Sequence, residues 1–249
     1  MPARAVVLPA TPLLVPGAGG EVDRLGDVRR AVDEVLDRLV SGPAATASGD
    51  GTLVVLAPVP RSGHGRVGRL RPSLAGAGVA DRWVPAVAGW ADAGAAAAHV
   101  PASVALVALR AALDRAGRGA DVADVVVVEV GADGPGADAR TVLGRAHGIV
   151  VAGGEVPGTP GAGADMPADT PADTPADVAP DPDSDLAADP GAADAPALAP
   201  AVRAALDETA APGAWAWQVG AVPGGHEHLP ASYPVAEGEV VGADRSTRA

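Results

Sequence analysis

The sequence predicts an α/β domain of three layers, with a central, largely parallel or mixed sheet flanked by helices. Short, continuous apolar runs bounded by Pro or Gly alternate with amphipathic segments along the chain. Such runs are typical of strands covered on both faces, and their alternation with helices produces a mainly parallel sheet. The length of 249 residues suits a single domain that carries a long insertion.

The first elements form a strand–helix–strand unit. Apolar runs predict strands at 5–8 and 52–56. Between them, apolar residues at three- and four-residue steps predict an amphipathic helix over 23–40. Because a strand, a helix and a second strand form a βαβ unit, the two strands should run in the same direction.

The later elements continue this alternation. A second helix is expected at 103–116, and the valine run at 125–128 predicts a central strand. A further apolar segment occupies 147–151, a third helix is expected at 197–209, and 239–242 is expected to form a short last strand. The predicted domain therefore comprises residues 1–152 and 197–249.

The segment 153–196 differs in composition from the rest of the chain. Residues 166–177 repeat a four-residue unit that ends in Pro-Ala-Asp, and 153–197 hold ten acidic residues and no basic one. The aspartates have helical spacing, but prolines recur at the same spacing, and each would cost a helix about 3 kcal/mol. We therefore predict a disordered, low-complexity acidic linker; a weak divalent-cation tract is the alternative.

Composition excludes several classes of function. The chain has no Lys and no Cys, and 18 Arg oppose 31 acidic residues for a net charge of −13. That charge disfavours nucleic acid and anionic membranes as partners. Without Lys there is no phosphate-binding P-loop, and without Cys there are no disulfides or thiolate metal sites. We find no signal segment and no membrane span, which predicts a cytoplasmic protein.

Several segments, taken in order, resemble the B-like branch of the class III extradiol ring-cleavage dioxygenase family. A strand is followed by the Pro-x-x-Pro-Leu-Leu-Val-Pro turn at 9–16 and by an Asp/Arg-rich helix. The helix that opens at Pro101 closes at Gly117, and 125–134 is similar to the family's valine strand and its glycine turn. Trp217-Gln218-Val219 stands where the resemblance implies a late helix.

In active members, the resemblance implies, two His and one Glu hold a mononuclear Fe(II), and oxygen cleaves a catechol ring. Such a triad leaves coordination positions open for substrate and oxygen. The first His would belong at Ala10, and the second would follow the strand 52–56, where Ala-Pro-Val-Pro stands at 57–60. Both positions are apolar, so the chain resembles a degenerate member that lacks the metal-binding histidines.

The remaining candidates for a metal site are His64, His226 and His228. His64 lies between glycines in a loop, and a solvated side chain is the alternative interpretation. His226-Glu227-His228 would place both imidazoles on one face of an extended segment, although the glycines around it are also typical of a surface loop. Two His with a carboxylate, from Glu227 or Glu237, suit Fe or Zn.

Other histidines and the tryptophans have structural interpretations. His99 and His147 border predicted helices, where we expect a capping or partly buried role. Four Trp are expected to pack helices against the sheet, and the alternative is that they line a pocket for an aromatic ligand.

Two hypotheses of function remain. The first is a non-catalytic binding or accessory homologue of the extradiol dioxygenases, with no catalytic residues and no cofactor, whose ligand is a small aromatic molecule. The second is an active Fe(II)-dependent ring-cleavage dioxygenase, or another metal-dependent enzyme that acts on a small aromatic substrate. A homo-oligomer is compatible with both.

Overall fold

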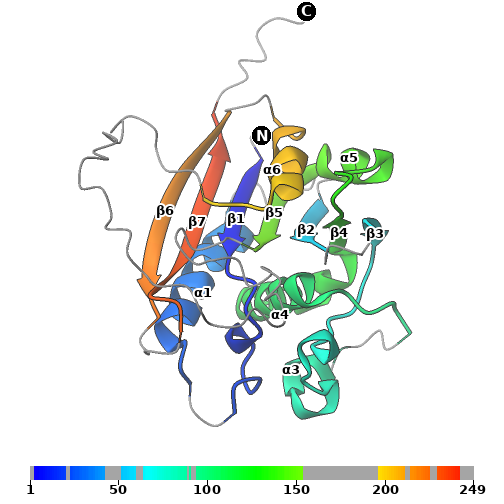
Figure 1. Ribbon diagram of the computed structural model, residues 1–249. Coiled ribbons are helices and arrows are strands. Elements are labelled where there is room, and N and C mark those ends of the chain that lie inside the picture. The colour runs from blue at the N-terminus through cyan, green and yellow to red at the C-terminus, as the bar shows by residue number, and fades with distance from the viewer. Residues whose placement is uncertain are drawn as a thin grey trace, which may run out of the picture.

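A seven-stranded mixed sheet forms the centre of the part of the chain that the structure describes (Figure 1). The structure is a computed structural model, and the residues it describes are 3–20, 23–42, 52–59, 64–88, 90, 94–153, 196–210, 214–224 and 229–241. Nearly all of the predicted acidic linker lies outside these residues, as do His226, Glu227 and His228.

The strand order is β3-β4-β2-β5-β1-β7-β6. The strands are β1 (Arg4–Leu8), β2 (Thr52–Pro58), β3 (Arg66–Gly68), β4 (Val126–Val130), β5 (Ala146–Ala152), β6 (Trp215–Pro223) and β7 (Ser232–Val240). The four middle strands β4, β2, β5 and β1 are parallel, while β3, β7 and β6 are added antiparallel at the two sides. The predicted parallel direction of β1 and β2 is confirmed, and β5 lies between them.

Helices cover both faces of the sheet, so the predicted three-layer α/β architecture is confirmed (Figure 1). The helices are α1 (Gly26–Ser41), α3 (Pro85–Ala88), α4 (Val100–Arg115), α5 (Ala137–Leu143) and α6 (Pro200–Asp207). Short 3-10 helices are η1 (Pro12–Leu14), η2 (Ala75–Ala77), η3 (Asp81–Trp83) and η4 (Gly119–Asp124).

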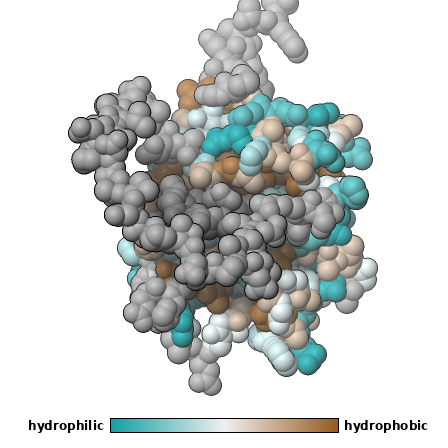
Figure 2. Space-filling model, in the orientation of Figure 1, coloured by the Kyte–Doolittle hydropathy of each residue, from teal (hydrophilic) through white to brown (hydrophobic). Residues whose placement is uncertain are grey.

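Alternating side chains of the strands supply two cores. Val6 and Leu8 of β1 face α1 and α4, whereas Ala5 and Val7 face α5 and α6. All four are fully buried, which explains why this strand is apolar without interruption. On the face shown in Figure 2, hydrophilic residues gather over α5 and α6 at the upper right.

Two expectations about elements are wrong. His147 lies in the central strand β5 and does not border a helix. Trp217-Gln218-Val219 lies in β6, where the resemblance implied a helix. In β6 the buried Trp215 and Trp217 alternate with the exposed Ala216 and Gln218, and this period of two is that of a strand.

The last strand is longer than expected. Residues 239–242 were expected to form a short strand, whereas β7 extends from Ser232 to Val240 and pairs with both β1 and β6. Within the described residues, no helix is both long and apolar enough to span a bilayer.

Candidate functional site

The turn after β1 is built by its prolines and by Thr11. The Thr11 hydroxyl accepts a hydrogen bond from the Leu13 N–H at 3.4 Å, and Pro12 begins η1. This is an N-cap, which Thr provides and for which Pro at the first helical position is well suited. Ala10, where the resemblance would place the first metal ligand, is half-buried and packs its methyl group against the core under α1 and α4.

The end of β2 is equally apolar. Ala57 is fully buried in the same core. The backbone N–H of Val59 donates to the Val130 carbonyl at 3.0 Å, which continues the pairing of β2 with β4. Iron in an oxygenase needs imidazole and carboxylate donors, so Ala10, Ala57 and Val59 do not fit the Fe(II) of the family. Nowhere in the described ranges do three His, Asp or Glu side chains come close enough to share one metal ion.

His64 lies at the carboxyl end of β4. It is exposed and precedes β3, and the adjacent Gly65 lies so close to β4 that a Cβ there would stand 2.8 Å from the Glu129 carbonyl oxygen. The other proposed ligands, His226 and His228, lie outside the described residues. Their convergence with His64 and with Glu227 or Glu237 therefore stays a prediction. Glu237 itself forms ion pairs with Arg4 at 2.8 Å and with Arg38 at 3.0 Å.

A buried Glu–His–Arg cluster lies beside this strand end. The carboxylate of Glu129 in β4 is fully buried and accepts from the His99 backbone N–H at 2.7 Å. Its other oxygen lies 2.9 Å from His99 Nδ1 and accepts from Arg66 Nε at 2.6 Å. Arg66 also donates to the Ala97 carbonyl, so it joins β3, β4 and the residues that precede α4.

This cluster was not predicted from the sequence. We expected a capping or partly buried role for His99, and the structure places His99 at the N-cap of α4, half-buried, with no capping hydrogen bond from its side chain. The available signal was Glu129 itself, an acidic residue inside the apolar run of β4. A buried carboxylate needs partners, but the sequence does not show that these are Arg66 and His99, which lie 63 and 30 residues away.

Asp81 organises the loop between β3 and α3. Burial alone would raise the pKa of Asp81, but hydrogen bonds from the Leu74 N–H, the Ser73 hydroxyl and Arg71 outweigh burial and lower it below its usual range. The charged carboxylate is therefore the form that the folded loop stabilises.

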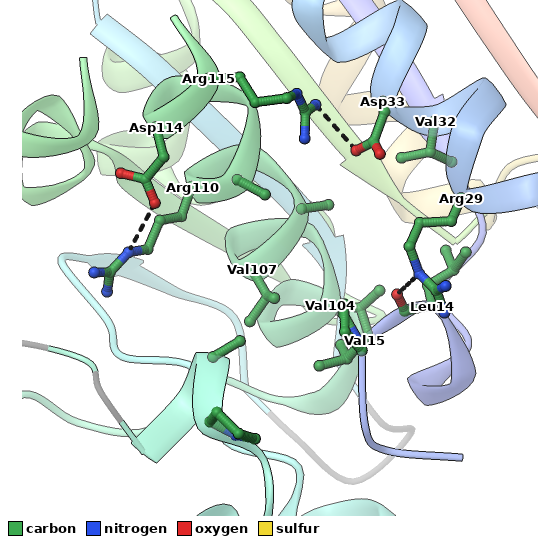
Figure 3. Close-up of a pocket in the computed structure, with 15 residues that line it drawn as sticks. Leu14, Val15, Arg29, Val32, Asp33, Val104, Val107, Arg110, Asp114 and Arg115 are labelled. Carbon is green, nitrogen blue, oxygen red and sulfur yellow. Dashed lines mark hydrogen bonds and ion pairs between the residues drawn. The ribbon is translucent and has the colours of Figure 1, made fainter. Parts of the chain in front are cut away.

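A pocket of about 430 Å³ lies between α1 and α4 and is bounded by η1 and α3 (Figure 3). Most of its lining is apolar and includes Leu14 and Val15 after β1, and Val104, Val107 and Ala108 of α4. The volume and lining are those of small-molecule sites, which are typically about 300–1,000 Å³ and mainly apolar.

Ion pairs border this pocket. Arg115 of α4 bonds to Asp33 at 3.0 Å and to Asp37 at 2.8 Å, both on α1, while Arg110 lies 3.6 Å from Asp114. Figure 3 shows the Arg115–Asp33 and Arg110–Asp114 pairs beyond the valines, toward the carboxyl end of α4. The hydrogen bond from Asp37, opposed by burial and aided by the charge of Asp33, raises the pKa of Arg115.

Arg29 fixes the other side of the pocket. It donates to the Leu14 carbonyl at 2.9 Å and to the Leu13 carbonyl at 3.1 Å, and it also pairs with Asp23. The turn after β1 is thereby held to α1, so the walls of the pocket are tied together by polar contacts on both sides.

The tryptophans lie outside the pocket lining. Trp215 and Trp217 stack with ring centroids 5.5 Å apart in the core under α5 and α6, which confirms the packing role expected for them. Trp90 packs against the opposite core with Arg110 over its ring, while Trp83 is 66% exposed.

Comparison with known proteins gives no relative for this fold and pocket. No protein-family model, curated protein or solved structure matches the chain. The resemblance to the extradiol dioxygenases therefore enters below as a proposal, and the arguments about function depend on the residues themselves.

Proposed function

We propose that the protein binds a small, largely apolar ligand with an aromatic ring, as a non-catalytic homologue of the class III extradiol dioxygenases. The observation that supports the proposal is the 430 Å³ pocket between α1 and α4. It has room for a substituted ring, and its lining removes apolar ligand surface from water, which stabilises a complex by about 25 cal/mol per Å² of apolar surface.

The walls of the pocket support binding by a preformed site. Val104 and Val107 are buried, β-branched residues of α4, and such side chains have few rotamers to lose when a ligand binds. The Arg115 pairs with Asp33 and Asp37 hold α4 to α1. A preformed pocket binds more tightly because little ordering cost opposes the contacts.

The apolar strand ends support a binding role over oxidation. Ala10 and Ala57 pack into the core at the positions where the family resemblance implies metal ligands. The pocket itself is lined by residues whose only charged groups are Arg and Asp.

A fluorescent aromatic probe tests the proposal. We expect 8-anilinonaphthalene-1-sulfonate to bind the purified full chain with a saturable rise in fluorescence, and catechol to compete with it. Ala108→Phe fills the pocket from α4 and should weaken probe binding at least about tenfold, since it replaces space for the ligand with protein. Ala204→Phe is the matched control, because Ala204 is an exposed alanine of α6 outside the pocket.

Two outcomes would overturn the proposal. Probe binding that Ala108→Phe leaves unchanged would place the ligand elsewhere. Stoichiometric iron in the purified protein, together with catechol cleavage under oxygen that His64→Ala and His228→Ala abolish, would favour the dioxygenase hypothesis in place of a binding protein.

A further inference from the structure

Strand β6 leaves one edge of the sheet unpaired. Within the described residues, β6 pairs with β7 on one side and with no strand on the other. Its nine residues, Trp-Ala-Trp-Gln-Val-Gly-Ala-Val-Pro, include no charged side chain. Val219, at the middle of the strand, is 42% exposed. The opposite edge, β3, has three residues, one of which is Arg66.

The pairing with β7 fixes which backbone groups face this open edge. Val241 N–H donates to the Ala214 carbonyl at 2.7 Å, and Gly224 N–H donates to the Ala231 carbonyl at 3.0 Å, so the ladder bonds at both ends involve even-numbered residues of this strand and its flanks. Antiparallel neighbours alternate between bonded and non-bonded pairs. The N–H and C=O groups of the odd residues 215, 217, 219 and 221 therefore point away from β7.

This edge lacks the usual protection against pairing. Natural edge strands are short, or carry charges, a bulge or a proline that discourages another strand. In β6 the register with β7 continues through all nine residues, and its proline is the last one, Pro223. The edge is therefore long, regular and uncharged, which is the geometry that accepts a further strand.

We propose that two copies of the chain pair antiparallel through β6, about a two-fold axis at Val219, and so continue the sheet across the dimer. An antiparallel pair centred on Val219 places Val219 opposite its own copy and Trp217 opposite Ala221. The outward groups of residues 217, 219 and 221 then bond to one another across the axis.

The side chains of β6 fit this self-pairing. A large Trp217 faces a small Ala221 at each symmetric position, so no two indoles oppose each other. The Trp217 ring lies over Gly238, where a Cβ would come within 2.6 Å of it, and its buried indole N–H has no acceptor among the described residues. An added strand brings carbonyl acceptors to this side of the sheet, and buried donors without acceptors are otherwise costly.

Charge favours a second copy under defined conditions. Each chain has a net charge of −13, and the paired strands contribute none of it. Dimerisation should therefore tighten as salt screens the repulsion between the two copies. Sedimentation velocity from 20 to 500 mM NaCl should show a dimer fraction that rises with salt.

Cysteine cross-linking tests the register, because the chain contains no Cys. Val219→Cys places two thiols in a directly opposed pair with Cα atoms about 5.5 Å apart, within the range of a disulfide. Ala221→Cys is the matched control on the same strand, since the two thiols would be four residues out of register, about 13 Å apart. We expect a covalent dimer under mild oxidation for Val219→Cys and none for Ala221→Cys.

A proline variant tests the edge itself. Val219→Pro removes an outward N–H and leaves the bonds to β7 intact, so it should yield a monomer with an unchanged far-ultraviolet circular dichroism spectrum. A wild-type monomer at all concentrations and salts, a dimer that persists in Val219→Pro, or cross-linking by Ala221→Cys in place of Val219→Cys would each overturn the proposal. A monomer would indicate that another segment of the chain, or a different protein, covers this edge.

Discussion

Removal of the buried carboxylate of Glu129 should be among the most destabilising polar changes in the described part of the chain. Three donor atoms surround the carboxylate at 2.6 to 2.9 Å, and the side chain has no exposed surface. Deletion of one partner of a buried ion pair typically costs about 3–5 kcal/mol. Arg66 is 37% exposed and can regain water, so we expect a value near the lower end, about 3 kcal/mol, for Glu129→Ala.

A conservative variant separates charge from shape. Glu129→Gln keeps an acceptor for the His99 N–H but loses the charge that faces Arg66. Hydrogen bonds to charged groups contribute about 1.5–3 kcal/mol and neutral ones about 0.5–1.5, so the difference predicts a loss of about 1–2 kcal/mol. The order of unfolding free energies should therefore be wild type, Glu129→Gln, Glu129→Ala.

Urea unfolding followed by tryptophan fluorescence measures these differences. The control is Glu239→Gln, because Glu239 is an exposed glutamate of β7, and surface changes of this kind usually alter stability by less than about 0.5 kcal/mol. If Glu129→Ala and Glu129→Gln both unfold within about 0.5 kcal/mol of the wild type, the argument that this cluster stabilises the carboxyl end of β4 is wrong.

Two further changes test the loop before α3 and the packing of β6. Because the pKa of Asp81 is lowered in the folded protein, its carboxylate stabilises the fold above the pKa of the unfolded chain, and that stabilisation is lost as pH falls through the folded value. Asp81→Ala should therefore cost about 1–3 kcal/mol at pH 7 and progressively less in acid, as urea unfolding at several pH values would show; an equal loss at pH 7 and pH 3 contradicts this. Gly238→Ala brings a methyl group within 2.6 Å of the rigid Trp217 ring, so it should cost about 1–3 kcal/mol and alter the near-ultraviolet circular dichroism of the indoles; an unchanged spectrum and stability would refute the close contact.

The predictable part of the fold is the part that local patterns specify. The runs at 5–8, 52–56 and 125–128 all form strands, because only a strand buried on both faces requires apolar residues without interruption. The amphipathic segment 23–40 forms α1, although the helix begins at Gly26. Asp23 precedes it and accepts from the Leu25 N–H at 3.2 Å, so the polar start of the segment is a turn.

The sequence left the antiparallel strands and the buried polar cluster undetermined. In β6, alternation is visible for only the first four residues, after which all side chains but one are exposed and the pattern ends. Its pairing with β7 is a long-range contact that local periodicity does not encode. The pocket is similarly hidden, since its lining combines residues from η1, α1, α3 and α4 that are separated along the chain.

The strand ends link the resemblance to the proposed function. A metal site at the carboxyl edge of a parallel sheet needs side chains that leave the core and turn toward solvent at the end of each strand. In this chain the corresponding residues continue the core: Ala57 is fully buried, and Ala10 packs against the same cluster. An imidazole at Ala57 would displace core side chains, which costs about 1–3 kcal/mol or more for overpacking alone. The edge is therefore packed as the end of a hydrophobic core, and the space available to a ligand lies one layer away, between α1 and α4.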